Sequence, residues 1–226
     1  MISKPQAVVP IVLGVVSTVL SFLMFLGIGY LLNSAGVSTK QLPSFIRSVV
    51  AAFISAGLPE EIAKFLMILL TLLVFRGRIR NVYEYILIGA GVGFGFTLLE
   101  EFLYGSAAGI TAIARLLTVV SHMMFGIIMA KHLGMAKYNK IKGSGSVAGE
   151  YALALIVPIL LHTLYDAGTA TNAYMNSGNE DDELIGIIIA LVVTVVLFTL
   201  QIVVPVRLKK NTEKYCGMLI SSAGCR

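Results

Sequence analysis

The chain has 226 residues, of which 57% are hydrophobic and only 13% are charged, and its mean hydropathy is +0.89. Soluble domains carry about 25% charged residues, so this composition excludes a soluble globular protein. The net charge of +5 does not indicate nucleic-acid binding, because the basic residues form short clusters between apolar runs. We therefore predict an all-α, polytopic transmembrane helical bundle that forms a single domain over residues 1–226.

Six apolar runs are long enough to cross a bilayer, which takes about 20 mostly apolar residues. They cover 7–32, 44–75, 83–105, 110–131, 149–172 and 184–206. The first run is too long for a signal peptide and is followed by further runs, so we interpret it as a retained helix. The polar stretches between the runs leave no room for a soluble domain. We expect a multi-pass protein of the cell membrane, with membrane lipids around it.

Basic residues predict the orientation of these runs. They follow the second, fourth and sixth runs, as Arg76, Arg78, Arg80, Lys131, Lys137, Lys140, Lys142, Arg207, Lys209, Lys210 and Lys214. If six spans alternate, all of these clusters fall on one side, which the positive-inside rule makes cytoplasmic. Both termini are then cytoplasmic, and residues 207–226 form a cytoplasmic tail.

A proline lies in the middle of the second run. Pro59 closely follows Gly57, and proline suits the first turn of a helix but breaks its interior. The pattern therefore favours two pieces, 44–57 and 59–75, of which the first is a re-entrant or tilted segment.

Glycines alternate through the third run. On a helix, Gly89 with Gly93 and Gly91 with Gly95 are small-xxx-small pairs, which let helices pack closely. A phosphate-binding loop is disfavoured, because the glycines lie inside an apolar segment and follow no strand. We expect close helix contacts here.

Ionisable residues also occur inside the runs, where each costs at least ~2.5 kcal/mol to insert. They are Glu60, Glu61, Lys64, Glu100, Glu101, Arg115, His122, His162 and Asp166. Counting 1.5 Å per residue from the expected cytoplasmic helix ends puts most of them at a depth of roughly 20–26 Å, with His122 at roughly 14 Å. The runs thus bring acids and imidazoles into one layer, and we predict a Glu/His/Asp site inside the bundle.

The second and fourth runs supply part of this layer. Glu60 and Lys64 have the i,i+4 spacing and order that favour an ion pair. Glu60 and Glu61 also lie in the first turn after Pro59, where the helix dipole stabilises carboxylates without any further function. His122 lies near the middle of its run, and a hydrogen-bonded core histidine is the alternative there.

The third and fifth runs supply the rest. Glu100 shares a helix face with Phe96 and Tyr104, although an acid at the membrane interface is the alternative. His162 and Asp166 are spaced i,i+4 on one face. A carboxylate in that position can fix the tautomer of a histidine, and a simple hydrogen bond between the two is the alternative.

These residue types support two kinds of water activation. Two histidines with carboxylates match a catalytic zinc site, in which three protein ligands and a water surround the metal and a glutamate takes the proton of that water. Without a metal, a glutamate and a histidine activate water and another histidine stabilises the oxyanion. The sequence contains neither His-Glu-x-x-His nor Gly-x-Ser-x-Gly, so zincin and serine-hydrolase chemistry are unsupported.

The motifs, taken in order, resemble those of the PrsW family of intramembrane proteases, which is related to the CAAX prenyl endopeptidases and bacteriocin-processing enzymes. The resemblance covers about 55–170. It rests on Glu60-Glu61-x-x-Lys64, Phe96-x-x-x-Glu100-x-x-x-Tyr104, His122 and His162-x-x-x-Asp166.

The resemblance implies a metalloprotease, with Zn²⁺ as the expected metal and membrane-anchored regulators such as anti-sigma factors as single-pass substrates. It implies catalytic roles for Glu60, Glu61, Glu100, His122, His162 and Asp166, with His122, His162 and Glu100 as metal ligands and Lys64 and Tyr104 in support. Two alternatives stay open. The same residues could form the proton or cation relay of a transporter, although no internal repeat is seen, or the chain could be a scaffold without activity.

Overall fold

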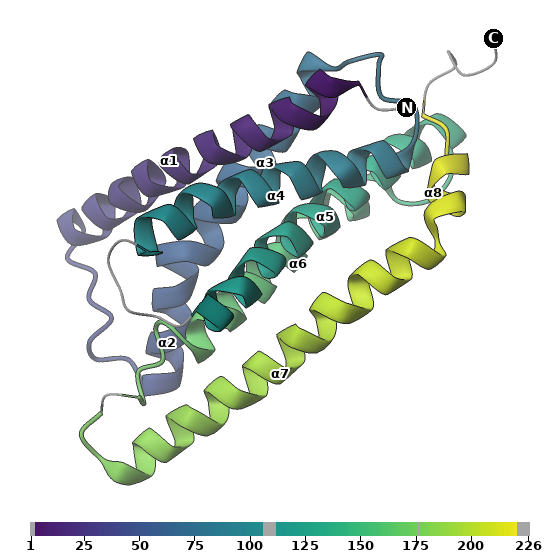
Figure 1. The fold of residues 1–226 in the computed structure, drawn as a ribbon. Helices are drawn as coiled ribbons and strands as arrows, with labels where there is room; N and C mark the ends of the chain where they lie inside the picture. Colours follow the sequence, from purple (N-terminus) through teal and green to yellow (C-terminus); the bar gives the residue numbers. More distant parts are fainter. Residues whose placement is uncertain (1–2, 106–111, 176, 221–226) are drawn as a thin grey trace.

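The computed structural model describes residues 3–105, 112–175 and 177–220, and these are helical apart from short connections (Figure 1). The elements are α1 (Lys4–Ser34), α2 (Ser44–Ala52), the π-helix η1 (Phe53–Gly57), α3 (Leu58–Val74), α4 (Val82–Gly105), α5 (Ala112–Lys142), α6 (Val147–Gly168), α7 (Glu180–Lys210) and α8 (Thr212–Gly217). The predicted all-α fold is confirmed. The side chains of residues 105–117, which include Arg115, lie outside the described part of the structure.

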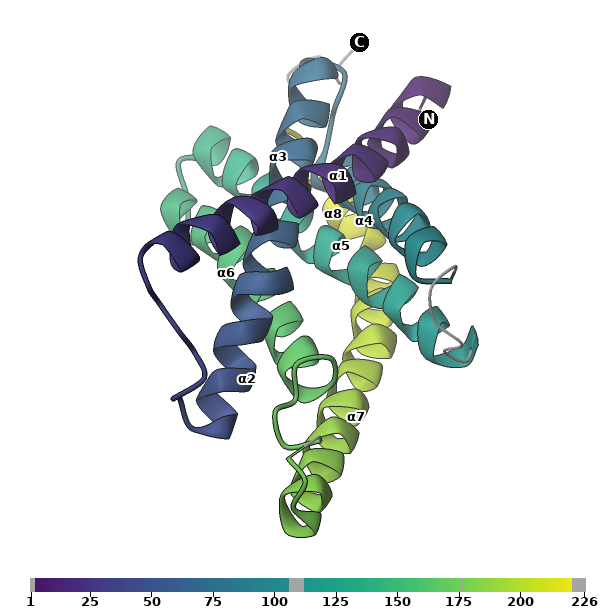
Figure 2. The same cartoon turned by 90° about the vertical axis from the view of Figure 1, so that its left-hand side faces the viewer.

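Five helices of the described chain are long and apolar enough to cross a membrane: α1, α4, α5, α6 and α7. The remaining predicted run, 44–75, is a composite of α2, η1 and α3, which follow one another directly as one bent helical path (Figure 2). Pro59 lies in the first turn of α3, where its missing N–H costs little. The wider π turn before it accommodates the proline, so the helix bends there and continues.

Helix α5 extends to Lys142, well past the predicted end of its run at 131. That prediction was wrong because the lysines of this segment resemble a loop, whereas Leu133 and Ala136 between them are buried. His132 Nδ1 also lies 2.6 Å from Glu150 Oε2 of α6, so α5 and α6 are joined in this region. Long basic side chains at a helix end reach the interface while their stems stay apolar.

Helix α4 packs between α1 and α5, and its glycines make both contacts possible. A Cβ on Gly89 would clash with the carbonyl oxygen of Gly126 on α5, and one on Gly95 would clash with the carbonyl oxygen of Ile11 on α1. The predicted close-packing pairs are therefore confirmed, because Gly93 likewise faces α5. The two pairs face different neighbours.

Helix α7 is the outermost span. It packs through one stripe of buried residues, which comprises Gly186, Val193, Leu197 and Gln201. Acidic residues fill its first turn and basic residues its last, as the helix dipole favours. Residues 207–226, predicted as a tail, begin inside α7 and include α8.

The chain end then returns to the α3–α4 connection, where the backbone N–H of Ile220 donates to the carbonyl of Arg80 (2.8 Å). The start of α1 and the described segment after α8 lie at the same end of the bundle (Figure 1).

Candidate active site

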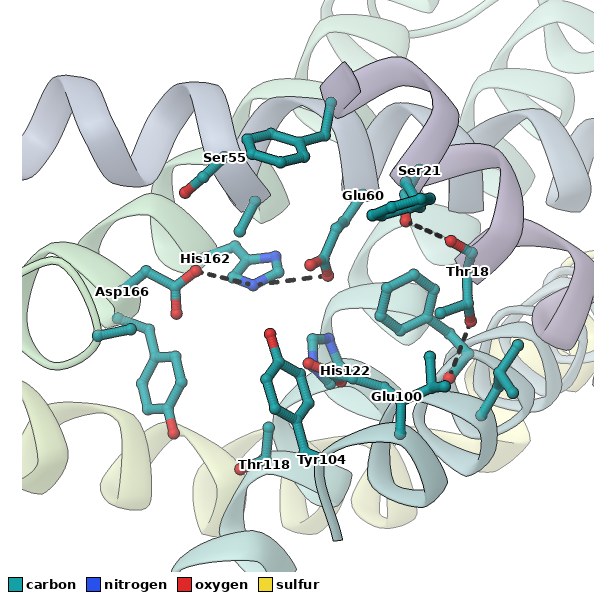
Figure 3. Close-up of a pocket in the computed structure, with 18 of the residues that line it drawn as sticks. Thr18, Ser21, Ser55, Glu60, Glu100, Tyr104, Thr118, His122, His162 and Asp166 are labelled. Carbon is teal, nitrogen blue, oxygen red and sulfur yellow. Dashed lines mark hydrogen bonds and ion pairs between the residues drawn. The ribbon is translucent and has the colours of Figure 1, made fainter. Parts of the chain in front are cut away.

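Polar side chains from four helices surround a cavity of about 820 Å³ inside the bundle (Figure 3). Five of the six predicted catalytic residues line it: Glu60, Glu100, His122, His162 and Asp166. Glu61, the sixth, lies behind them with its side chain fully buried. The motifs, which are separate along the chain, thus come together in one site, to which α3, α4, α5 and α6 each contribute.

A buried ion pair forms the base of the site. Lys64 Nζ lies 2.7 Å from Glu61 Oε1, and neither side chain has any solvent exposure. The ion pair that the sequence predicted, between Lys64 and Glu60, is also present, at a longer distance of 3.5 Å. The ammonium also lies 3.9 Å from the centre of the Phe96 ring. Charges buried this deeply are stable only when paired and hydrogen-bonded, so Glu61 and Lys64 act as a unit.

His122 lies between this pair and Glu100. Lys64 Nζ is 3.0 Å from His122 Nδ1, and because an ammonium can only donate, Nδ1 is the acceptor. The proton of the neutral imidazole is then on Nε2, which lies 2.8 Å from Glu100 Oε2. This tautomer follows from the hydrogen-bond network. Both ring nitrogens of His122 therefore have partners.

His162 presents one of its nitrogens to the cavity. Its Nδ1 lies 2.7 Å from Glu61 Oε1, and because a carboxylate only accepts, Nδ1 carries the proton. In the neutral imidazole its Nε2 is then an acceptor, and it lies 3.8 Å from Glu60 Oε2 and 3.7 Å from Asp166 Oδ2. Asp166 was expected to support His162, but the shorter contact is with Glu61. Figure 3 shows Glu60 and Asp166 on either side of the ring.

The adjacent residues Glu60 and Glu61 have different surroundings. Glu61 accepts from both Lys64 and His162 and is fully buried, whereas Glu60 keeps 16% of its side chain exposed in the cavity. Consecutive residues of a helix point about 100° apart, which explains the difference. Within the described chain, Glu61 Oε2 is buried without a hydrogen-bond partner, and such an oxygen usually has a water or an ion nearby.

Helix α1 also lines the cavity, which the sequence did not predict. Thr18 and Ser21 face it and are buried. Thr18 Oγ1 donates to the carbonyl of Phe96 (3.0 Å) and Ser21 Oγ to the carbonyl of Thr18 (2.8 Å). The i,i+3 spacing of hydroxyl residues within an apolar run was the available signal, since such residues favour helix interfaces in membranes. Tyr104 lines the cavity too, half exposed, and its hydroxyl points inward (Figure 3).

The donor set fits a metal ion. Glu60, Glu61, His122 and His162 each offer one ligand atom, and these atoms lie within 4.8 Å of one another. Imidazole nitrogens and carboxylate oxygens at roughly 2.0–2.2 Å are zinc ligands, which puts tetrahedral ligand atoms about 3.3–3.6 Å apart. The separations of His162 Nε2 from Glu60 and Asp166, 3.8 and 3.7 Å, are close to this value. At His122 Nδ1 a cation would instead meet Lys64.

The chain is also similar to known proteins. A family model described as "PrsW family intramembrane metalloprotease" matches residues 4–201. Protease PrsW of Halalkalibacterium halodurans is 36% identical over 126 residues, which are 54% of this chain and 56% of the relative.

Two further relatives carry the same name. Protease PrsW of Bacillus subtilis is 32% identical over 121 residues, or 53% of this chain and 54% of the relative. That of Geobacillus kaustophilus is 37% identical over 117 residues, or 51% and 50%. The matches thus span about half the length of these relatives. No solved structure matches the chain.

Proposed function

The chain belongs to the PrsW family of intramembrane metalloproteases, and we propose that it is an endopeptidase that hydrolyses peptide bonds of single-pass membrane proteins, such as membrane-anchored regulators of the anti-sigma type. One observation carries the proposal: His162 Nε2 lies 3.8 Å from Glu60 and 3.7 Å from Asp166 in a cavity inside an apolar bundle. Ionisable groups at membrane depth are costly and are kept for function.

Glu60 is the proposed general base, because it is the glutamate of the pair that faces the cavity. Its carboxylate takes a proton from a water molecule as the water oxygen bonds to the carbonyl carbon of the scissile peptide. The same proton then passes to the nitrogen of the leaving amine as the C–N bond breaks. General acid–base catalysis of this kind contributes about 10²–10⁴-fold in rate.

Glu61 and Lys64 hold the two histidines in defined tautomers. Glu61 accepts from His162 Nδ1, which leaves Nε2 free as a ligand or acceptor in the cavity. Lys64 donates to His122 Nδ1, which directs the Nε2 proton of His122 toward Glu100. Tyr104, whose hydroxyl points into the cavity, is placed to donate to the oxyanion of the tetrahedral intermediate.

The metal would be held by the donors that face the cavity. His162 Nε2 and Asp166 lie 3.7 Å apart and are the proposed ligands, so Glu60, 3.8 Å from the same nitrogen, stays available as the base. The sequence favoured His122, His162 and Glu100 as ligands. In a site of this kind Zn²⁺ polarises the carbonyl and lowers the pKa of water to about 7. We propose that the metal is Zn²⁺ and that its ligands lie around His162 rather than His122, because Lys64 already contacts His122 Nδ1.

For orientation, we propose that the end of the bundle at which α1 begins and α7 ends is cytoplasmic in the cell membrane. Arg80 of the α3–α4 connection pairs with the C-terminal segment there, and α7 ends there in Arg207, Lys209 and Lys210. This clustering of positive charge supports the positive-inside assignment.

The test is cleavage of a single-pass membrane reporter library by the purified protein in liposomes. Wild type is expected to cleave, Glu60→Gln to lose at least 10²-fold in rate, and a chelator to abolish the activity. Glu150→Gln removes a carboxylate that pairs with His132 away from the cavity and serves as the matched control. Absence of cleavage together with background metal content would instead support a scaffold or transport role.

A further inference from the structure

The cavity has two unlike walls. One carries the acids and histidines described above. The other is apolar and consists of Val19, Phe22 and Phe25 of α1 with Leu99 and Leu103 of α4. Among the described lining residues none is a lysine or an arginine. Figure 3 shows α1, through Thr18 and Ser21, across the cavity from His162 and Asp166. A peptide bound between the walls would therefore contact catalytic groups on one side and apolar groups on the other.

The apolar wall is held firmly in place. Gly14 of α1 lies so close to α4 that a Cβ there would clash with the carbonyl oxygen of Val92. One turn later, Thr18 donates to the carbonyl of Phe96. Phe22 and Phe25 follow Thr18 at i+4 and i+7, so they continue the same face of the helix. Close packing just before the wall thus positions these rings beside the cavity.

The wall is open on its outer side. Phe22 is 59% and Leu103 is 53% exposed, whereas His122 and His162 are at most 3% exposed. From Phe22 to Ser34, α1 has no buried residue. A substrate entering from the lipid would thus meet apolar side chains first and the catalytic groups behind them.

The size of the cavity limits what part of a substrate it can select. An intact helix is about 10–12 Å wide with a 5.4 Å pitch, so one turn fills roughly 500 Å³. A cavity of about 820 Å³ therefore holds about one and a half such turns. Selection inside it therefore depends on the few residues beside the scissile bond.

We propose that the α1–α4 wall is a side-chain subsite for a large apolar residue, such as leucine or phenylalanine, next to the scissile bond. This inference rests on the proposed protease function. An acidic side chain is disfavoured, because Glu60, Glu100 and Asp166 face the same cavity. A small one leaves Phe22 and Leu103 uncovered. Methylene-sized differences in an apolar pocket change kcat/KM by about 10–200-fold.

The first experiment varies the substrate and the wall together. Reporters carry leucine, phenylalanine, alanine, lysine or aspartate on either side of the scissile bond. Wild type is expected to cleave the leucine or phenylalanine form at least tenfold better than the alanine form, and the aspartate form least. Phe22→Ala removes that preference and Phe22→Leu keeps most of it. Leu23→Ala is the control, because Leu23 is equally exposed on α1 but does not line the cavity.

The second experiment does not need cleavage. In the Glu60→Gln background, a benzophenone side chain is introduced at position 22 or at position 23, and the leucine reporter is irradiated with each protein. Cross-linking is expected from position 22 and at least tenfold less from position 23. Equal cross-linking, or equal cleavage of all reporters by wild type, would overturn the subsite. Selective cross-linking without any cleavage by wild type would support the subsite and refute the peptidase assignment.

Discussion

Replacing Lys64 with methionine tests whether the buried ion pair holds the site together. Lys64 and Glu61 have no solvent exposure and lie 2.7 Å apart. Methionine keeps the volume and flexible stem of lysine, and its sulfur can still contact an aromatic ring such as Phe96. The substitution therefore removes the charge and the hydrogen bonds while leaving the packing largely intact.

The expected loss of stability is large. Removing one member of a buried ion pair leaves the other charge uncompensated, which costs about 3–5 kcal/mol. In the Lys64→Met protein, Glu61 retains only His162 among its two hydrogen-bond donors, and His122 loses the donor to its Nδ1. The double variant Lys64→Met/Glu61→Gln should recover most of the loss, because no buried carboxylate is left without its cation.

Reversible unfolding in mixed detergent micelles measures the free energy of unfolding of each variant. Lys142→Met is the matched control, because Lys142 is exposed and its ammonium lies 6.0 Å from the Tyr138 ring centre. Exposed substitutions of this kind change stability by about 0.5 kcal/mol or less. If Lys64→Met and Lys142→Met proved equally stable, the ion pair would not be the base of the site.

Two further measurements test the metal site and the helix packing. His162→Ala is expected to lose bound zinc, measured by mass spectrometry of the purified protein, while His122→Ala keeps most of it; the reverse result would favour the ligand set expected from the sequence. Gly95→Ala is expected to destabilise the protein by about 1–3 kcal/mol through overpacking against Ile11. In the same unfolding assay, Gly27→Ala should be neutral or stabilising, because nothing lies within 4 Å of a Cβ there. Equal effects of the two substitutions on the free energy of unfolding would refute the packing argument.

The sequence was sufficient to predict that the ionisable residues of four helices come together, because charges inside apolar runs are too costly to be incidental. It did not predict that α1 also lines the cavity. Depth was harder to judge. His122 was expected to lie lower than the other polar groups, because its helix was predicted to end at 131. Since α5 continues to Lys142, His122 lies about 30 Å from that end at 1.5 Å per residue. The error was in the helix boundary, where lysines on a helix resemble a loop.

The contacts within the site could not be predicted from spacing. Residues at i+3 and i+4 both share a helix face, so the spacing did not decide whether Glu60 or Glu61 would make the shorter contact with Lys64. That choice depends on the rotation of α3, which is set by its packing after the π turn of η1. The same rotation brings Glu61 into short contact with His162 Nδ1. Asp166, which lies on the same helix as His162, is farther from the ring.

Glycines explain how four helices can hold their donors so close together. A Cβ on Gly93 of α4 would clash with the carbonyl oxygen of His122 itself, and one on Gly57 of η1 would clash with Thr163, the neighbour of His162. Helices α5 and α6, which carry the two histidines, therefore each pack against a glycine at the level of that histidine. Ligand atoms within 4.8 Å of one another require backbones closer than larger side chains allow. The glycines that pack these helices together thus determine the separation of the ligand atoms, on which the proposed metal binding and water activation depend.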